Sequence, residues 1–107
     1  RGRWLLEDHP GAHSELAING MIDGKLVRAT IDRTFVDQAG IRWVVDYKTS
    51  GPPTDGMDRE SFLLEEKVRY QDQLRVYLEL MRQLYPGQPA RAALYFPLFD
   101  GWVVVEE

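Results

Sequence analysis

The chain contains no cysteine, and its 107 residues include no apolar stretch long enough to cross a membrane. The missing cysteine excludes disulfides, thiolate zinc sites and cysteine-held iron–sulfur clusters from these residues. A reducing compartment is permitted, so we expect a cytoplasmic protein. Hydrophobic residues still make up 44% of the sequence, which indicates a folded domain with one modest core.

An excess of positive charge is also missing. The net charge of −4 argues against a simple basic DNA-binding module. Basic and acidic residues are equal in number over residues 1–50, so this half would become net positive if some of its acids held a divalent cation. The sequence starts at Arg1 without a methionine or signal peptide. We therefore expect residues 1–107 to be a single domain excised from a longer protein.

The apolar pattern and the turn residues predict an α/β fold. A meander of three antiparallel strands is expected first, with Asp23-Gly24 as a tight hairpin turn. Residues 51–56 contain two prolines and two glycines and predict a loop. A long helix, with Asp58 as its N-cap, and two more strands on a mixed sheet follow. The predicted elements cover residues 15–22, 25–36, 41–47, 58–84 (the helix), 90–96 and 102–105.

Pairing of the first three strands aligns three acids. A two-residue turn at Asp23-Gly24 places Glu15 opposite Asp32. A three-residue loop over residues 38–40, with its glycine in the left-handed conformation, places Asp32 opposite Asp46. The three carboxylates would then form a row on one face of the sheet, roughly 5 Å apart at Cβ.

Such a row is costly because like charges on adjacent strands repel one another. A divalent cation would neutralise it, and carboxylate oxygens suit magnesium, manganese or calcium. Lys48 follows Asp46 by two residues and shares its face, where it can orient or help deprotonate a water for attack on a phosphodiester. The alternative is a structural domain in which these acids are only solvated surface charges, as most exposed acids are.

Other residues receive structural interpretations. Arg33 points away from Asp32 and is expected to form a surface or inter-element salt bridge. Tyr70 is expected to pack at the rim of the helix interface, although its ring could also stack on a base. Glu66 is assigned to a solvated helix face, and the three tryptophans to core or edge packing.

Three runs together resemble the PD-(D/E)xK nuclease superfamily, which implies a restriction-endonuclease-like core. They are Ile31-Asp32-Arg33, Val44-Val45-Asp46-Tyr47-Lys48-Thr49-Ser50 and Tyr70-Gln71-Asp72-Gln73-Leu74-Arg75-Val76-Tyr77. More narrowly, the chain is similar to the C-terminal nuclease domain of RecB and AddA helicase–nucleases. That family's pattern is Glu, then I-D-R, then D-Y-K-T, then Q-x-x-x-Y on the following helix, and the resemblance covers roughly residues 15–97.

The resemblance implies a metal site. Asp32 and Asp46 are implied to be metal ligands and Glu15 a further acidic ligand, while the backbone carbonyl of Tyr47 completes the shell. The implied cofactor is Mg²⁺, with Mn²⁺ as a substitute, and no iron–sulfur cluster is expected.

The resemblance also implies catalytic residues. Lys48 corresponds to the catalytic lysine and acts together with Asp46. Gln73 and Tyr77 match Q-x-x-x-Y, and their spacing puts both on one helix face. This face would pack over the site, with Gln73 reaching the metal–water network or a DNA phosphate.

The implied function is metal-dependent hydrolysis of DNA by an exodeoxyribonuclease similar to exonuclease V. It would belong to an ATP-dependent helicase–nuclease acting in double-strand-break repair and recombination. The expected partners are DNA, a UvrD-like helicase domain in the same parent chain and a partner subunit, and the sequence would be a C-terminal fragment. The alternative is a catalytically inactive nuclease-fold module that binds DNA or docks a partner.

Overall fold

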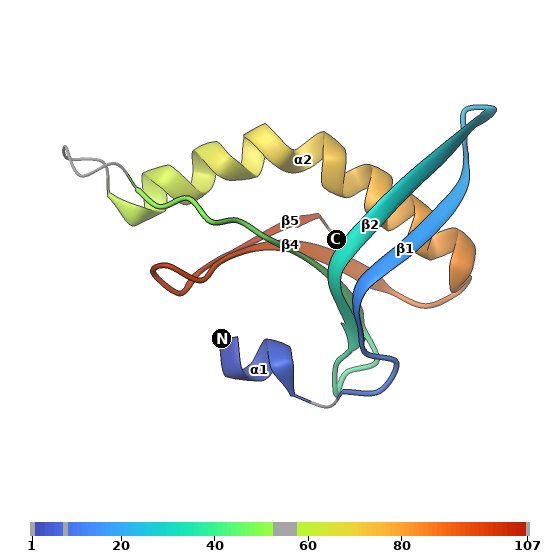
Figure 1. Cartoon of the computed structure of the whole chain (residues 1–107), viewed down its shortest axis with the longest axis horizontal. Coiled ribbons are helices and arrows are strands. Elements are labelled where there is room, and N and C mark those ends of the chain that lie inside the picture. Colours follow the sequence, from blue (N-terminus) through green and yellow to red (C-terminus); the bar gives the residue numbers. More distant parts are fainter. Residues whose placement is uncertain (1, 8, 53–57, 107) are drawn as a thin grey trace.

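The computed structural model describes residues 2–7, 9–52 and 58–106. All strands belong to one sheet in the order β1-β2-β3-β4-β5. Figure 1 shows that the long helix α2 covers one face of this sheet and the short helix α1 lies on the other side. The elements are α1 (Gly2–Leu6), β1 (His13–Ile22), β2 (Lys25–Val36), β3 (Arg42–Tyr47), α2 (Arg59–Leu84), β4 (Ala90–Phe96) and β5 (Gly101–Glu106).

The predicted fold class is confirmed. β1, β2 and β3 form an antiparallel meander, β3 and β4 pair in parallel, and β5 is antiparallel to β4. The carboxylate of Asp58 accepts the backbone N–H of Ser61 at 2.7 Å and caps α2. Residues 51 and 52 lie outside helix and strand, and residues 53–56 of the predicted loop lie outside the described residues.

Both predicted strand registers are confirmed. Asp23 and Gly24 have φ values of 51° and 77°, as a tight hairpin turn requires, and Ile22 pairs with Lys25. At the second turn, Gly40 has a φ of 80° and the backbone N–H of Asp37 donates to the carbonyl of Ile41 at 2.9 Å. The two turns therefore fix how β2 lies against both of its neighbours.

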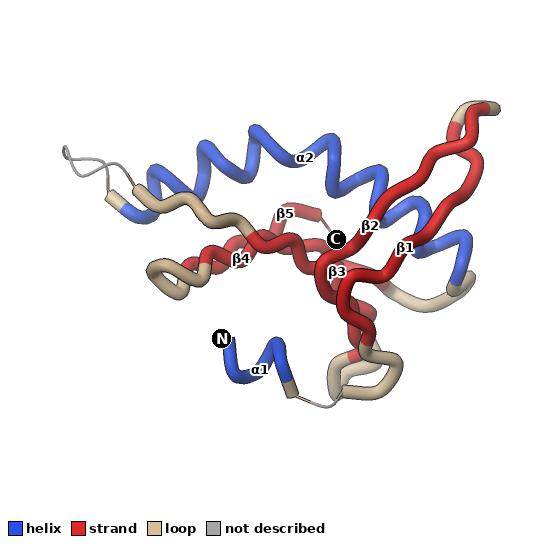
Figure 2. The backbone as a smooth tube through the Cα atoms, in the orientation of Figure 1, coloured by secondary structure: helices blue, strands red, loops and turns tan. Residues whose placement is uncertain are grey.

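Figure 2 shows the strands of the sheet with α2 on one side and α1 on the other, and a hydrophobic cluster lies on each of these sides. On the α2 side, Leu74, Leu78 and Met81 of the helix pack on buried residues of the strands. On the α1 side, Leu5 packs among Phe35, Trp43 and other residues, and Trp4 and Trp102 lie against this second cluster. The tryptophans are therefore packing residues, as predicted, and β3 is covered on both faces.

Helix α1 was not predicted, and it corrects the interpretation of Arg33. The Arg33 guanidinium donates to the carbonyl of Leu5 at 2.9 Å, to that of Glu7 at 3.0 Å and to Ser14 Oγ at 3.0 Å. Only 9% of this arginine is exposed. The predicted surface position is wrong because this side chain is buried; among the described residues its donors go to two backbone carbonyls at the end of α1 and to a serine hydroxyl.

Glu66 is also different from its prediction. It is 6% exposed, on the stripe of α2 that contains Phe62, Tyr70 and Leu74, with Oε2 3.9 Å from Nη1 of Arg69. The charge of Glu66 favoured a solvent-exposed position. Its spacing of four residues from Phe62 instead puts it on the side of the helix that faces the core. Among the described helices, none combines the length and the apolar character needed to span a membrane.

Candidate active site

The strongest concentration of predicted site residues lies where β2 and β3 meet. Arg33 pairs with Val45, and continuing this register by one residue brings Asp32 of β2 beside Asp46 of β3. Tyr47 is the last residue of β3, and Lys48 follows it. β3 is the middle strand of the sheet, so the candidate site is built on the most enclosed strand rather than on a loop.

The two aspartates form a close pair. Asp32 Oδ2 accepts the backbone N–H of Tyr47 at 2.8 Å, which ties this carboxylate to the backbone of β3. Asp46 is only 7% exposed. Burial, and then a hydrogen bond with the Asp32 carboxyl group, raise the pKa of Asp46 to about 6 despite the opposing effect of Lys48. The pair therefore concentrates negative charge that the protein alone does not fully offset.

Lys48 provides a counter-charge without fully satisfying Asp46. Its Nζ lies 2.8 Å from Asp46 Oδ2, and its backbone N–H donates to the carbonyl of Tyr95 at 2.9 Å. Within the described residues, Asp46 Oδ2 is nevertheless a buried oxygen with no aligned hydrogen-bond donor. The ammonium is close enough for charge attraction and opposes the rise in the pKa of Asp46, but it does not cancel the effect of burial. One carboxylate oxygen thus keeps coordinating capacity.

Helix α2 brings Gln73 and Tyr77 to the site. Gln73 Nε2 donates to Tyr77 Oη at 2.8 Å, which bears out the prediction that they share a helix face. Burial raises the pKa of Tyr77, and the nearby negative charge of Asp46 adds to the rise. The phenol therefore lies near enough to Asp46 for its charge to act on it, while Gln73 is exposed.

Glu15 does not join the pair, which corrects the predicted row of three carboxylates. The pairing of β1 with β2 passes from Ser14–Arg33 to Leu16–Ile31, and Glu15 has a φ of 52°. The prediction assumed extended backbone at every residue, and a left-handed residue breaks the alternation of side chains. Across the described residues, no three acidic or histidine side chains are grouped so that they could hold a metal.

Tyr70 makes a contact with the site that the sequence did not predict. It packs against the α2-side cluster, as predicted, but its ring centroid also lies 3.8 Å from Lys48 Nζ. The available signal was its position one helical turn before Gln73, on the side of the helix that approaches the sheet.

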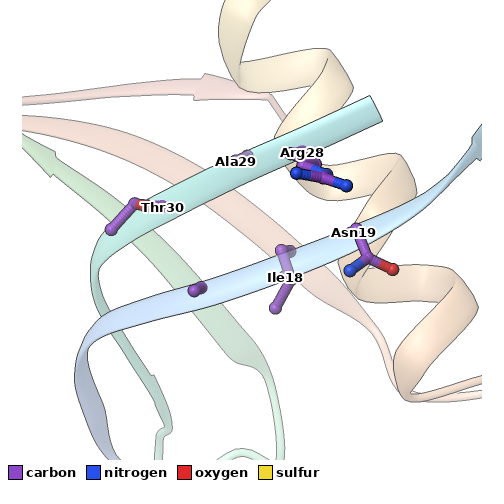
Figure 3. Close-up of a pocket in the computed structure, with 6 residues that line it drawn as sticks. Ile18, Asn19, Arg28, Ala29 and Thr30 are labelled. Atoms are coloured by element: carbon purple, nitrogen blue, oxygen red, sulfur yellow. The ribbon is translucent and has the colours of Figure 1, made fainter. Parts of the chain in front are cut away.

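Two surface hollows lie away from these residues. A groove of about 440 Å³ on the β1–β2 hairpin is lined by Ile18, Asn19, Arg28 and neighbouring residues (Figure 3), and another of about 470 Å³ lies between β1 and the end of α2. Neither includes an acidic residue, so the chemical interpretation rests on the carboxylate pair.

The residues at the pair fit a hard divalent cation. The carboxylates of Asp32 and Asp46 and the nearby carbonyl of Tyr47 are all oxygen donors, which favours Mg²⁺ or Mn²⁺ over softer metals. The buried Asp46 Oδ2, which accepts no aligned hydrogen bond, is the observation that most favours cation binding by these residues. A cation there would also offset the repulsion between the two carboxylates.

Comparison with known families agrees with this geometry. The family model of the PD-(D/E)XK nuclease superfamily matches residues 2–101. A search of curated proteins gives no match to the chain. The matched range contains β1 to β4, α2 and every residue of the predicted site. From this match and the arrangement of strands and helix, we conclude that the chain belongs to the PD-(D/E)XK nuclease superfamily.

Proposed function

We propose that this chain is a DNA nuclease domain that hydrolyses phosphodiester bonds with a divalent cation. The observation that carries the proposal is the buried Asp32–Asp46 pair, with Lys48 Nζ 2.8 Å from Asp46 Oδ2. Membership of a nuclease superfamily supports a phosphodiester-hydrolysing enzyme that binds DNA.

Asp32, Asp46 and the carbonyl of Tyr47 are the proposed ligands of Mg²⁺, for which Mn²⁺ can substitute. When bound, the cation supplies positive charge to the scissile phosphate and lowers the pKa of a bound water. The Asp32 carboxylate also holds the backbone at Tyr47, because it accepts the N–H of that residue. The role of Glu15 as a metal ligand stays a prediction. Its side chain could join the two aspartates only if its backbone left the left-handed conformation.

Lys48 is the proposed catalytic lysine. Its ammonium holds the attacking water or a phosphate oxygen by charge-assisted hydrogen bonds. The water oxygen forms a new bond to phosphorus and gives up a proton, one ester P–O bond breaks, and the leaving oxygen takes up a proton. The Tyr77 phenol lies near enough to Asp46 for its charge to act on it, and it accepts a hydrogen bond from the exposed Gln73. Both side chains are proposed to orient the water and a DNA phosphate.

The test is metal-dependent DNA cleavage by the protein and by variants of this pair. Asp46→Asn and Lys48→Ala are each expected to reduce cleavage by at least about a hundredfold, as losses of central electrostatic groups do. A matched control is Asp72→Asn, since Asp72 lies on the exposed side of α2 with a 98% exposed side chain. If both site variants cut as fast as the unmodified protein, the mechanism is wrong.

A finer proposal concerns the parent protein. The D-Y-K-T and Q-x-x-x-Y runs support a RecB- or AddA-type nuclease domain at the C-terminus of a UvrD-like helicase, acting as an exonuclease V-like enzyme in cytoplasmic recombinational repair with a partner subunit. ATP-dependent degradation of linear duplex DNA by the parent protein tests this role. Cleavage that is indifferent to ATP would contradict it.

A second candidate is a non-cutting DNA-binding or docking module. The position of Glu15 outside the carboxylate pair favours it, because two carboxylates hold a metal less firmly than three. Calorimetry with Mn²⁺ separates the two candidates: binding that disappears in Asp32→Asn and Asp46→Asn supports the nuclease, and no binding by the unmodified protein supports the docking module.

A further inference from the structure

We propose that Tyr70 is a positioning residue that holds the ammonium of Lys48 against its ring, beside the carboxylate of Asp46. This inference rests on the proposed function, in which Lys48 takes part in hydrolysis. It assigns a specific role to a residue outside the Asp-Tyr-Lys and Q-x-x-x-Y runs.

The geometry places Lys48 Nζ between two groups of different elements. It lies 2.8 Å from Asp46 Oδ2, on β3, and 3.8 Å from the centroid of the Tyr70 ring, on α2. The second distance is well inside the limit of about 6 Å for attraction between a cation and an aromatic face. The side chain of Lys48 is 19% exposed, so solvent screens these contacts only in part.

The ring is held by its own packing. Tyr70 lies against the hydrophobic cluster between α2 and the sheet. It is one turn after Glu66 and one turn before Leu74, which are 6% and 0% exposed. A side chain with two rotatable angles in such a position has few alternatives. It can therefore restrain a more flexible neighbour.

Lysine needs such a restraint because its four-carbon stem carries about 2 kcal/mol of rotamer entropy. Backbone pairing fixes only the start of the stem, through the hydrogen bond from the Lys48 N–H to Tyr95. An aromatic face attracts the ammonium but, unlike a second carboxylate, it neither neutralises the charge nor accepts the N–H donors as hydrogen-bond partners. Those donors stay available for water or phosphate.

One further cation lies near the same ring. The guanidinium carbon of Arg69 is 5.4 Å from the Tyr70 centroid, and the side chain of Arg69 is 70% exposed. It is farther from the ring and more hydrated than Lys48, so Lys48 has the stronger contact. Arg69 also approaches Glu66, which draws its charge away from the ring.

The first test measures the contact itself, without metal or substrate. The sequence has three lysines, Lys25, Lys48 and Lys67, so the ε-methylene NMR signals of the labelled protein can be assigned with Lys→Arg variants. A ring current from Tyr70 is expected to shift the Lys48 signal upfield from the other two. Tyr70→Phe is expected to keep the shift and Tyr70→Leu to abolish it. A Lys48 signal at the position of Lys25, or one unchanged in Tyr70→Leu, overturns the inference.

The second test measures catalysis. Tyr70→Leu is expected to lower kcat about tenfold with little change in KM, since a contact of this kind is worth about one such factor, and Tyr70→Phe is expected to retain kcat. The matched control is Tyr85→Leu, because Tyr85 packs against the same cluster but its ring contacts Arg42 at 3.9 Å. Equal losses of kcat in both leucine variants would show a structural role instead. A higher KM at unchanged kcat in Tyr70→Leu would show that the ring stacks on a base.

Lys48→Ala separates this inference from the proposed function. If Lys48→Ala cuts normally, the proposed function fails, while the NMR shift still decides whether Tyr70 holds the ammonium. If Lys48→Ala is impaired and Tyr70→Leu is not, only the role of Tyr70 fails. In the Lys48→Ala background, Tyr70→Leu is expected to reduce the residual rate no further, because both changes remove the same interaction.

Discussion

The backbone N–H of Tyr47 donates to Asp32 Oδ2 at 2.8 Å, so a side chain of β2 holds the peptide bond that joins Asp46 to Tyr47. Asp32 is thereby both a proposed ligand and a support for the backbone of the catalytic strand. These two roles can be separated by substitution.

Asp32→Asn is expected to keep the hydrogen bond to Tyr47, since the amide oxygen is still an acceptor, and to lose cation binding and cleavage. Asp32→Ala is expected to lose both and to be less stable than Asp32→Asn by about 1 kcal/mol, because the Tyr47 N–H loses its partner. Urea unfolding gives the stability and calorimetry with Mn²⁺ the binding. Equal stability of the two variants would show that the hydrogen bond contributes nothing.

Asp46→Asn is expected to stabilise the metal-free protein while it abolishes cleavage. The pKa of Asp46 is raised to about 6, so the folded state binds this proton more tightly than the unfolded state does. Its contribution to stability therefore falls as the pH rises from about 4 towards 6. The advantage of Asp46→Asn should be present at pH 8 and disappear near pH 4, as measured by urea unfolding in EDTA. An advantage that is independent of pH would contradict the explanation.

Asp37→Asn is expected to lose stability at neutral pH but not in acid. Burial alone would raise the pKa of Asp37, but hydrogen bonds from the Trp43 indole and the backbone of Ile41 and Ala39 outweigh it and lower the pKa. The ionised carboxylate thus stabilises the fold above its unfolded pKa of about 4, and this contribution is lost as the pH falls further. The difference in free energy of unfolding between the unmodified protein and Asp37→Asn, measured by urea unfolding, should disappear below that pH. Asp72→Asn should show no such difference at either pH.

Arg33→Ala is expected to detach α1 and to cost roughly 2 kcal/mol, because the carbonyls of Leu5 and Glu7 lose their donors. Hydrogen exchange of residues 2–7 should rise selectively. Arg28→Ala is the matched control, since Arg28 lies on the same strand and is exposed. Similar exchange in both variants would mean that Arg33 does not anchor the helix.

The sequence was most informative where local turn chemistry fixes long-range pairing. The Asp23-Gly24 turn and the glycine at residue 40 determine the two registers, and from these follows the approach of Asp32 to Asp46. The amphipathic spacing of α2 similarly placed Gln73 and Tyr77 on one face. These features depend on the period of side chains along strand and helix, which can be counted in a sequence.

The features that were missed depend on tertiary contacts. Helix α1 has five residues, too few for a periodic pattern, and is held by Arg33 from a distant strand. Glu15 takes a left-handed conformation that glycine would have signalled but glutamate does not. The contact of Tyr70 with Lys48 joins residues on two elements, and only the packing of α2 on the sheet brings them together.

The central position of β3 has a consequence for how the protein opens. This strand pairs with β2 on one side and β4 on the other, and its inner residues Val44 and Val45 are fully buried. Its amides should therefore exchange only through global unfolding, after α1 has opened locally. Asp46 of β3 and Asp32 of the paired strand β2 are therefore held together until the whole domain unfolds, because local opening at α1 does not separate them.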